Sequence, residues 1–237
     1  MEYIIPFSII ALAAAIHASF QLSISTLTLM SGHTLGKKQS QTRLVKVLGG
    51  FLFGAMSMTA LLFVGLSYLG EFTLAGGTVP PILWAALCGI LFGLGVAVWL
   101  FYYRQGKGTM LWIPRGMALY LAERSKRTKS TAEAFALGLA SIAGELLFII
   151  APLGVAVLVS LTLEPVLQVA ALLLYVAISL FSLAIVAALV GSGHKISRIQ
   201  QWREENKRFM QFIAGTSLFV LGFYLYVNEV LLLGVWQ

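Results

Sequence analysis

Two ionisable side chains, His17 and Glu145, lie in the middle of long apolar runs of the sequence. Counted from the start of each run at about 1.5 Å per residue, both fall near the midplane of a bilayer. Ionisable groups at that depth are costly, and they usually mark a substrate, ion or proton site. A His–Glu pair there could bind a cation, or accept and release a proton.

Neighbouring polar residues extend this candidate site. Gln21 lies one helical turn after His17 on the same face, Ser19 flanks that face, and Ser141 lies one turn before Glu145. The predicted site for substrate or proton binding is therefore His17, Gln21, Glu145, Ser19 and Ser141.

Two further roles follow from the same stretch of sequence. Pro152 lies two turns after Glu145 and is the predicted helix break for gating. His17 and Glu145 are also the candidate ligands for a metal cation. Each residue has a structural alternative as well: His17 could bond to a backbone carbonyl, and a protonated Glu145 could bond to Ser or Gln across a helix interface. Ser and Thr in the first run are also typical of helix packing.

The composition predicts the elements that must hold these residues. Of 237 residues, 59% are hydrophobic and 11% are charged, whereas soluble domains carry about 25% charged residues. Each apolar run is long enough to span a bilayer as a helix. We expect an all-α polytopic membrane protein, with a single transmembrane domain over residues 1–237. Its six predicted transmembrane helices cover residues 4–31, 45–70, 80–103, 133–162, 165–191 and 208–233.

The basic residues predict the orientation. All 16 Lys and Arg residues lie in three windows, 37–46, 104–129 and 195–208, and the other connections have none. The positive-inside rule places these three loops in the cytoplasm. Because the number of helices is even, both chain ends then lie on the outer side (N-out, C-out). The membrane itself is expected to be the cytoplasmic (inner) membrane.

The same order of elements, helix, basic loop, helix, helix, occurs twice along the chain. Residues 1–103 form the first three-helix unit, residues 104–132 connect the two, and residues 133–237 form the second. Three helices per unit invert the second copy, and inverted repeats are a transporter architecture. The segment after Pro114 is either a short helix on the cytoplasmic surface or a plain basic connector attracted to anionic lipid. We also expect close helix contacts at two glycine pairs, Gly50 with Gly54 and Gly89 with Gly93.

The placement of charges and the absence of known motifs argue against several classes of function. The net charge of +7 arises from loop windows beside spans, which argues against a nucleic-acid partner. Nucleotide, dinucleotide, zinc-protease and serine-hydrolase motifs are absent, so we expect neither an enzyme nor a cofactor. Cys88 is the single cysteine and lies in an apolar run, where a small core residue is expected.

Three stretches resemble the LysE-type transporter superfamily, and within it the cytochrome c biogenesis branch of CcdA and the membrane part of DsbD. They are residues 134–139 continuing through Gly144 to residues 152–154, residues 212–225, and the end of the first helix at Ser31-Gly32. The resemblance implies six helices, inverted halves and a contact between helices 1 and 4. The redox branch has a cysteine in each of those helices, but this chain has Ala18 or Ser19 and Phe148 there. Transmembrane thiol–disulfide exchange is therefore excluded by that mechanism.

The expected function is a secondary transporter, an exporter of a small solute or metal cation. Coupling would pass through His17, Gln21 and Glu145, with lipid and the solute or ion as partners. The alternative is a non-transporting membrane scaffold derived from a CcdA-like protein that has lost its thiols. A homodimer and a larger membrane complex both stay open as assembly states.

Overall fold

The computed structural model describes residues 3–20, 22–35, 41–74, 78–102, 115–194 and 196–231. Within these ranges all elements are helices, and no strand occurs. Four helices are long and apolar enough to cross a membrane, and the number rises to six if each of two bent helix pairs crosses as one span. The all-α architecture is confirmed, with four to six candidate spans.

The four continuous helices cover four of the predicted runs. They are α3 (Gln41–Leu74), α4 (Pro81–Tyr102), α6 (Thr131–Leu161) and α10 (Lys207–Leu225), which continues into the π-helical turn η1 (Tyr226–Leu231). A capping box fixes the start of α6: the Ser130 hydroxyl accepts from the Glu133 N–H, and the Glu133 carboxylate accepts from the Ser130 N–H.

The first and fifth runs are each broken into two helices. Helices α1 (Ile4–Ser19) and α2 (Leu22–Leu35) meet at 45°, and α7 (Pro165–Ser179) and α8 (Phe181–Gly191) meet at 49°. Neither break contains Pro or Gly. Instead, the last residue before each break is a serine whose hydroxyl donates to the carbonyl three residues earlier, Ser19 to Ile16 and Ser179 to Val176. Such bonds compete with the helical pattern and bend helices.

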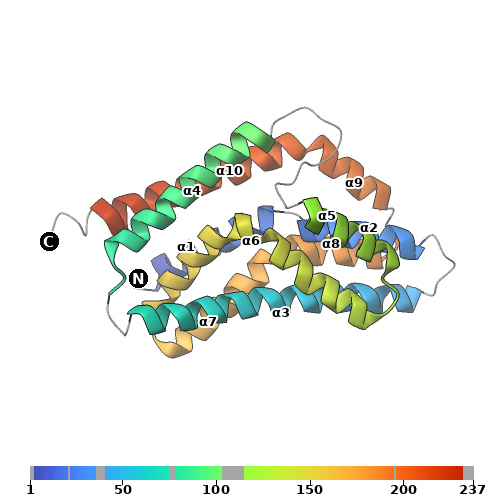
Figure 1. The fold of residues 1–237 in the computed structure, drawn as a ribbon, viewed down its shortest axis with the longest axis horizontal. Helices are drawn as coiled ribbons and strands as arrows, with labels where there is room; N and C mark the ends of the chain where they lie inside the picture. Colours follow the sequence, from blue (N-terminus) through green and yellow to red (C-terminus); the bar gives the residue numbers. More distant parts are fainter. Residues whose placement is uncertain are drawn as a thin grey trace.

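The helices form an elongated bundle (Figure 1). Helices α4 and α10 pack along one side, α1 and α6 lie in the middle, and α3 and α7 lie on the other side. The α3–α6 contact is the most extensive in the described chain. There a Cβ on Gly54 would collide with the Phe135 carbonyl, and a Cβ on Gly138 with the Phe51 carbonyl. The predicted close contact at Gly50 and Gly54 is therefore confirmed.

The other glycine pair behaves differently. A Cβ added to Gly89 or Gly93 would meet no atom within 4 Å, so the prediction of a close helix contact there is wrong. In α4 it is Gly95 that meets a neighbour, the Phe219 ring of α10. Spacing alone does not say which face of a helix meets a neighbour.

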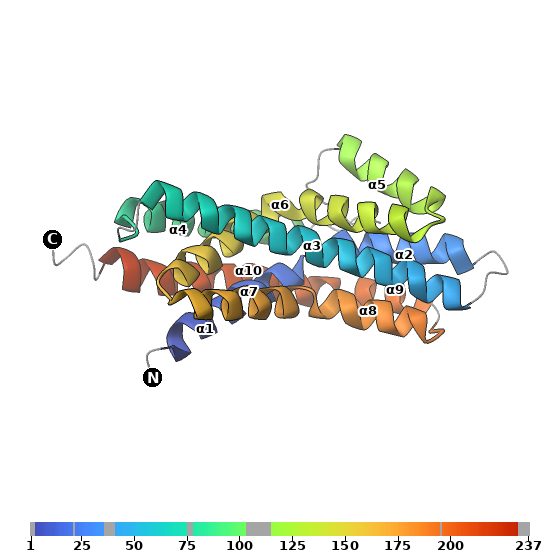
Figure 2. The same ribbon diagram turned by 90° about the horizontal axis from the view of Figure 1, so that it is seen from below.

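The basic helix ends gather at one end of the bundle. The start of α3, helix α5 (Arg115–Arg127) and helix α9 (Ile196–Glu205) all lie at that end in both views (Figures 1 and 2). Arg43 at the start of α3 donates to the Lys129 carbonyl at 2.9 Å, which joins two of the basic windows directly. The start of α1, the α6–α7 connection and η1 lie at the opposite end.

Helix α5 confirms that a helix follows Pro114. The helix packs against α2 and α6, and its Leu121 and Ser125 are buried, while Leu119 and Tyr120 are exposed. Residues 103–114, which include the first part of the predicted surface segment, lie outside the described residues.

Candidate functional site

His17 lies in the last turn of α1 and is 1% exposed. Its Nδ1 is hydrogen-bonded to the Tyr175 hydroxyl of α7 at 3.0 Å. Its Nε2 faces Glu145 of α6, 3.7 Å from Oε2. That distance is too long for a hydrogen bond but suits an ion pair when the imidazole is protonated. Among the described residues, Nε2 has no hydrogen-bond partner.

Glu145 uses its other oxygen to hold the start of α2. Its Oε1 accepts two hydrogen bonds of 2.6 Å, one from the Ser23 backbone N–H and one from the Ser23 hydroxyl. Ser23 is the second residue of α2. The first N–H groups of a helix have no partner within it, and the helix dipole favours negative charge there. A carboxylate on α6 therefore caps a half-helix that begins inside the bundle.

The second broken span reaches the same place. The Ser182 hydroxyl, in the first turn of α8, donates to the Ala18 carbonyl at 3.1 Å. A cavity of about 10 Å3 borders His17, Glu145, Ser179 and Ser182, which is near the smallest space that can hold one water molecule. Both helix breaks thus meet at one buried polar cluster, formed by His17, Ser23, Glu145, Tyr175, Ser179 and Ser182.

The structure brings together the two residues on which the predicted site depends, His17 and Glu145. It places Ser19 and Ser141 differently. The Ser141 hydroxyl donates to the Gly138 carbonyl of its own helix. Ser19 borders a second cavity rather than the His–Glu cluster. Gln21 lies outside the described residues.

Pro152 corrects the expectation of a helix break in the fourth run. Helix α6 runs without interruption from residue 131 to residue 161, through Pro152. Proline is tolerated within membrane helices because neighbouring groups satisfy the backbone that it frees. The breaks lie instead between the end of α1 at Ser19 and the start of α2 at Leu22, and at Leu180.

Sequence reasoning missed Tyr175 and gave Ser23 no role in the site. Tyr175 is fully buried, ten residues after Pro165, the first residue of α7. Tyrosine in membrane proteins concentrates at the interfaces, and a buried hydroxyl needs a partner. A tyrosine in the middle of a span was therefore an available signal. The sequence gives no such signal for Ser23, because its role depends on a helix break that no Pro or Gly marks.

A metal role for His17 and Glu145 stays a prediction. The 3.7 Å between Nε2 and Oε2 could accommodate a shared cation. In the described part of the chain, however, no group of three His, Cys, Asp or Glu side chains comes together. The arrangement is better suited to a proton than to a tightly bound metal, because structural and catalytic metal sites use three or four protein ligands.

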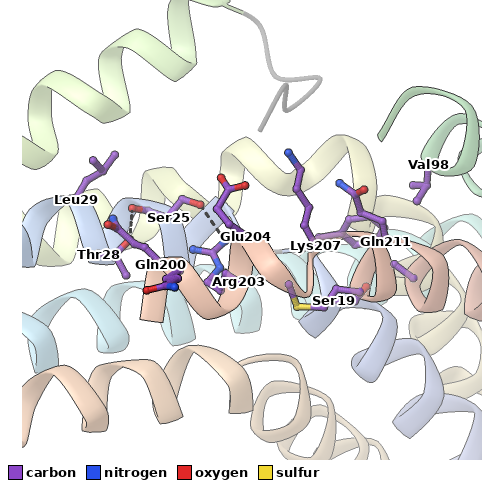
Figure 3. A pocket seen from close by; sticks show the side chains of 14 residues that line it. Ser19, Ser25, Thr28, Leu29, Val98, Gln200, Arg203, Glu204, Lys207 and Gln211 are labelled. Atoms are coloured by element: carbon purple, nitrogen blue, oxygen red, sulfur yellow. Dashed lines mark hydrogen bonds between the residues drawn. The ribbon is translucent and has the colours of Figure 1, made fainter. Parts of the chain in front are cut away.

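A larger cavity of about 460 Å3 lies beyond the break, toward the basic end. Residues of α2, α9 and α10 form most of its wall, and Figure 3 shows Arg203, Lys207 and Gln211 along one side of it. Phe20 borders this cavity and the smaller one. Its ring stacks on Phe148 with centroids 5.3 Å apart, so Phe20 lies at the boundary of both spaces.

Comparison with known proteins finds no match: no family model fits the sequence, and neither a curated protein nor a solved structure is significantly similar to it. The resemblance to the LysE and CcdA families therefore stays a prediction, and the function must be argued from the site.

Proposed function

We propose that this chain is a proton-coupled secondary transporter of a small solute. The observation that carries the proposal is the His17–Glu145 pair, buried where two broken apolar spans meet. Discontinuous helices, with half-helix ends directed at substrates and coupling ions, are how many transporters build their central site. Titratable side chains deep in spans commonly relay protons in pumps and transporters.

Glu145 is the proposed proton carrier, and its contacts give a mechanism. While ionised, its carboxylate holds the start of α2 through Ser23 and attracts a protonated His17. Protonation of Glu145 removes the charge that the α2 N-terminus favours. The α1–α2 bend is then free to change angle, and release of the proton from Glu145 to the opposite side restores the carboxylate and its contacts with Ser23 and His17. Proton occupancy is thereby coupled to the geometry of a broken span.

The moving parts we propose are the two bent spans. They are the first and fifth of the six runs, which do not correspond to each other under a three-helix inverted repeat. Motion at the Phe20 and Leu180 breaks would move Phe20 and connect the larger cavity with the His–Glu pair. The basic end, in this proposal, faces the cytoplasm of a cell with an inner membrane, and both chain ends lie outside.

Proteoliposomes loaded with a pH-sensitive dye test the proposal. Gradients of carboxylic acids, phosphate esters, amino acids and divalent cations would be applied in turn, and solute-driven pH change recorded. Glu145→Gln removes the carboxylate that carries the proton but keeps an acceptor for Ser23. We expect it to reduce solute-driven proton flux at least about tenfold, as expected when a positioned proton-transfer group is lost.

Glu164→Gln is the matched control, because Glu164 is exposed at the other end of the bundle and makes no side-chain cap. It should transport like the wild type. Equal flux in the wild type and Glu145→Gln would refute the assigned site. If no solute produced flux in the wild type, the transporter proposal would fail and a membrane scaffold would be favoured.

A further inference from the structure

The cavity of about 460 Å3 has a lining that favours a particular chemistry. Its size falls within the range of about 300–1,000 Å3 typical of small-molecule sites. We propose that it binds the carboxylate or phosphate group of a small organic anion that also carries a hydrogen-bond donor. This inference rests on the proposed function, for which it names the substrate class, but binding can be tested without transport.

The positive charge of the cavity comes from Arg203 of α9 and Lys207 of α10. The Arg203 guanidinium is half-buried and held in place, since it donates to the Ser25 hydroxyl at 3.2 Å (Figure 3). Burial lowers the pKa of Arg203, yet arginine stays charged in proteins. A partly desolvated, oriented guanidinium is the group best suited to bind carboxylate or phosphate oxygens. Glu204 is the single acidic residue among the described lining residues, which therefore carry a net positive charge.

Gln211 supplies the second recognition element. It is 9% exposed, it lines the cavity, and its Oε1 has no hydrogen-bond partner among the described residues. A buried carbonyl oxygen without a partner costs free energy. A ligand hydroxyl or amino group would satisfy it. Because Gln211 lies one helical turn after Lys207 on α10, one small molecule can reach both.

The rest of the wall limits the ligand in another way. Phe20, Leu29, Val98, Met210 and Ala214 give the cavity an apolar portion. The ligand we infer is therefore amphipathic, with an anionic end near Arg203 and an apolar part nearer Phe20. A fully hydrated inorganic ion would leave that apolar surface without a contact.

The same chemistry has two possible sources. One is a water-soluble organic anion, and the other is the phosphate and glycerol headgroup of an anionic lipid, because the cavity lies at the basic end of a membrane protein. Lactate and propionate form a matched pair of soluble probes that differ in one hydroxyl. Glycerol 3-phosphate represents the headgroup in soluble form, and phosphatidylglycerol and phosphatidylcholine supply the lipid forms.

Binding would be measured by calorimetry and by thermal stability of the protein purified in a neutral detergent. We expect lactate or glycerol 3-phosphate to bind more tightly than propionate, and Gln211→Leu to remove that difference. Arg203→Gln should weaken binding at least about tenfold, equivalent to about 1.4 kcal/mol. Arg198→Gln is the matched control, since Arg198 is exposed on the same helix and does not line the cavity.

The outcomes separate the possibilities. Arg203-dependent binding of the soluble anions supports a solute site, and Arg203-dependent stabilisation by phosphatidylglycerol alone assigns the site to a lipid headgroup. Absence of binding by any anion, or equal loss in Arg203→Gln and Arg198→Gln, would overturn the proposal. Arg203→Lys retains the positive charge, and serves if Arg203→Gln does not fold. Binding should survive in Glu145→Gln, so failure of coupling and failure of this site are distinguishable.

Discussion

Two residues, Tyr175 and Glu145, contact the His17 ring, and the two contacts have different effects on it. Its Nδ1 is hydrogen-bonded to the Tyr175 hydroxyl, while its Nε2 lies 3.7 Å from Glu145 Oε2. The tyrosine fixes the orientation of the ring, and the carboxylate responds to protonation. Tyr175 itself is fixed by burial and by the nearby Phe63 ring, with centroids 5.4 Å apart. We therefore propose that Tyr175 is a positioning residue, which acts on the His17–Glu145 pair through His17.

Tyr175→Phe tests this role directly. The change removes one oxygen atom and leaves His17 Nδ1 buried without that partner, which should cost about 1–3 kcal/mol of unfolding free energy. Solute-driven proton flux should fall as the imidazole loses its orientation. Tyr68→Phe is the control, because Tyr68 is 71% exposed. Thermal unfolding in detergent and flux in proteoliposomes would be compared, and equal behaviour of the two variants would exclude a positioning role.

At the scale of elements, the α3–α6 interface is the most extensive and closest helix contact in the described chain. The backbones of the two helices approach so closely that a methyl group on either Gly54 or Gly138 would meet a carbonyl oxygen. Close approach of this kind brings dispersion contacts and rigidity to helix pairs in membranes. We therefore propose that α6, which carries Glu145, stays fixed against α3 while the angle between α1 and α2 changes.

Gly54→Ala should destabilise the protein by about 1–3 kcal/mol, the usual cost of overpacking a well-packed interface. Gly49→Ala, on the same helix, should be neutral or stabilising by up to about 1 kcal/mol, because nothing lies within 4 Å of its added Cβ and alanine favours helix. Thermal unfolding of the two purified variants decides the matter. Loss of stability in both, or in neither, would contradict the packing argument.

The apolar runs could be predicted from the sequence because a span needs about 20 apolar residues whatever its neighbours are. The breaks could not. Ser19 and Ser179 bond to their own helices, but serines at many other positions in the spans do so without a break, as Ser141 does within α6. What distinguishes the broken spans is tertiary: Glu145 caps α2, and Ser182 bonds across to Ala18.

The candidate site, like the fold, could be predicted only in part from the sequence. His17 and Glu145 could be found because ionisable residues in apolar runs are few. Their pairing required a contact between segments more than a hundred residues apart, and it was indicated by the presumed symmetry of the halves and by the family resemblance rather than by the residues themselves. The cavity beside Arg203 could not be inferred, because it depends on how α9 packs near α2.

At the scale of the molecule, charge is divided between the two ends of the bundle. The described basic residues of α3, α5 and α9 lie at one end, and Glu164 lies in the connection at the other. The bends of 45° and 49° leave each broken span running onward along the bundle rather than turning back. Six crossings follow if each bent pair spans the membrane once, and the ends then alternate as the positive-inside rule requires.

Cysteine labelling tests this arrangement, using Lys126→Cys at the basic end, Glu164→Cys at the opposite end and Tyr3→Cys at the start of α1. All three positions are exposed. In intact cells, a membrane-impermeant maleimide should label Glu164→Cys and Tyr3→Cys but not Lys126→Cys, and inside-out vesicles should reverse the pattern. Cys88, which is 2% exposed, provides the unlabelled background. Labelling of Lys126→Cys in intact cells would invert the proposed orientation, whereas protection of Tyr3→Cys alone would show that α1 and α2 do not cross as one span.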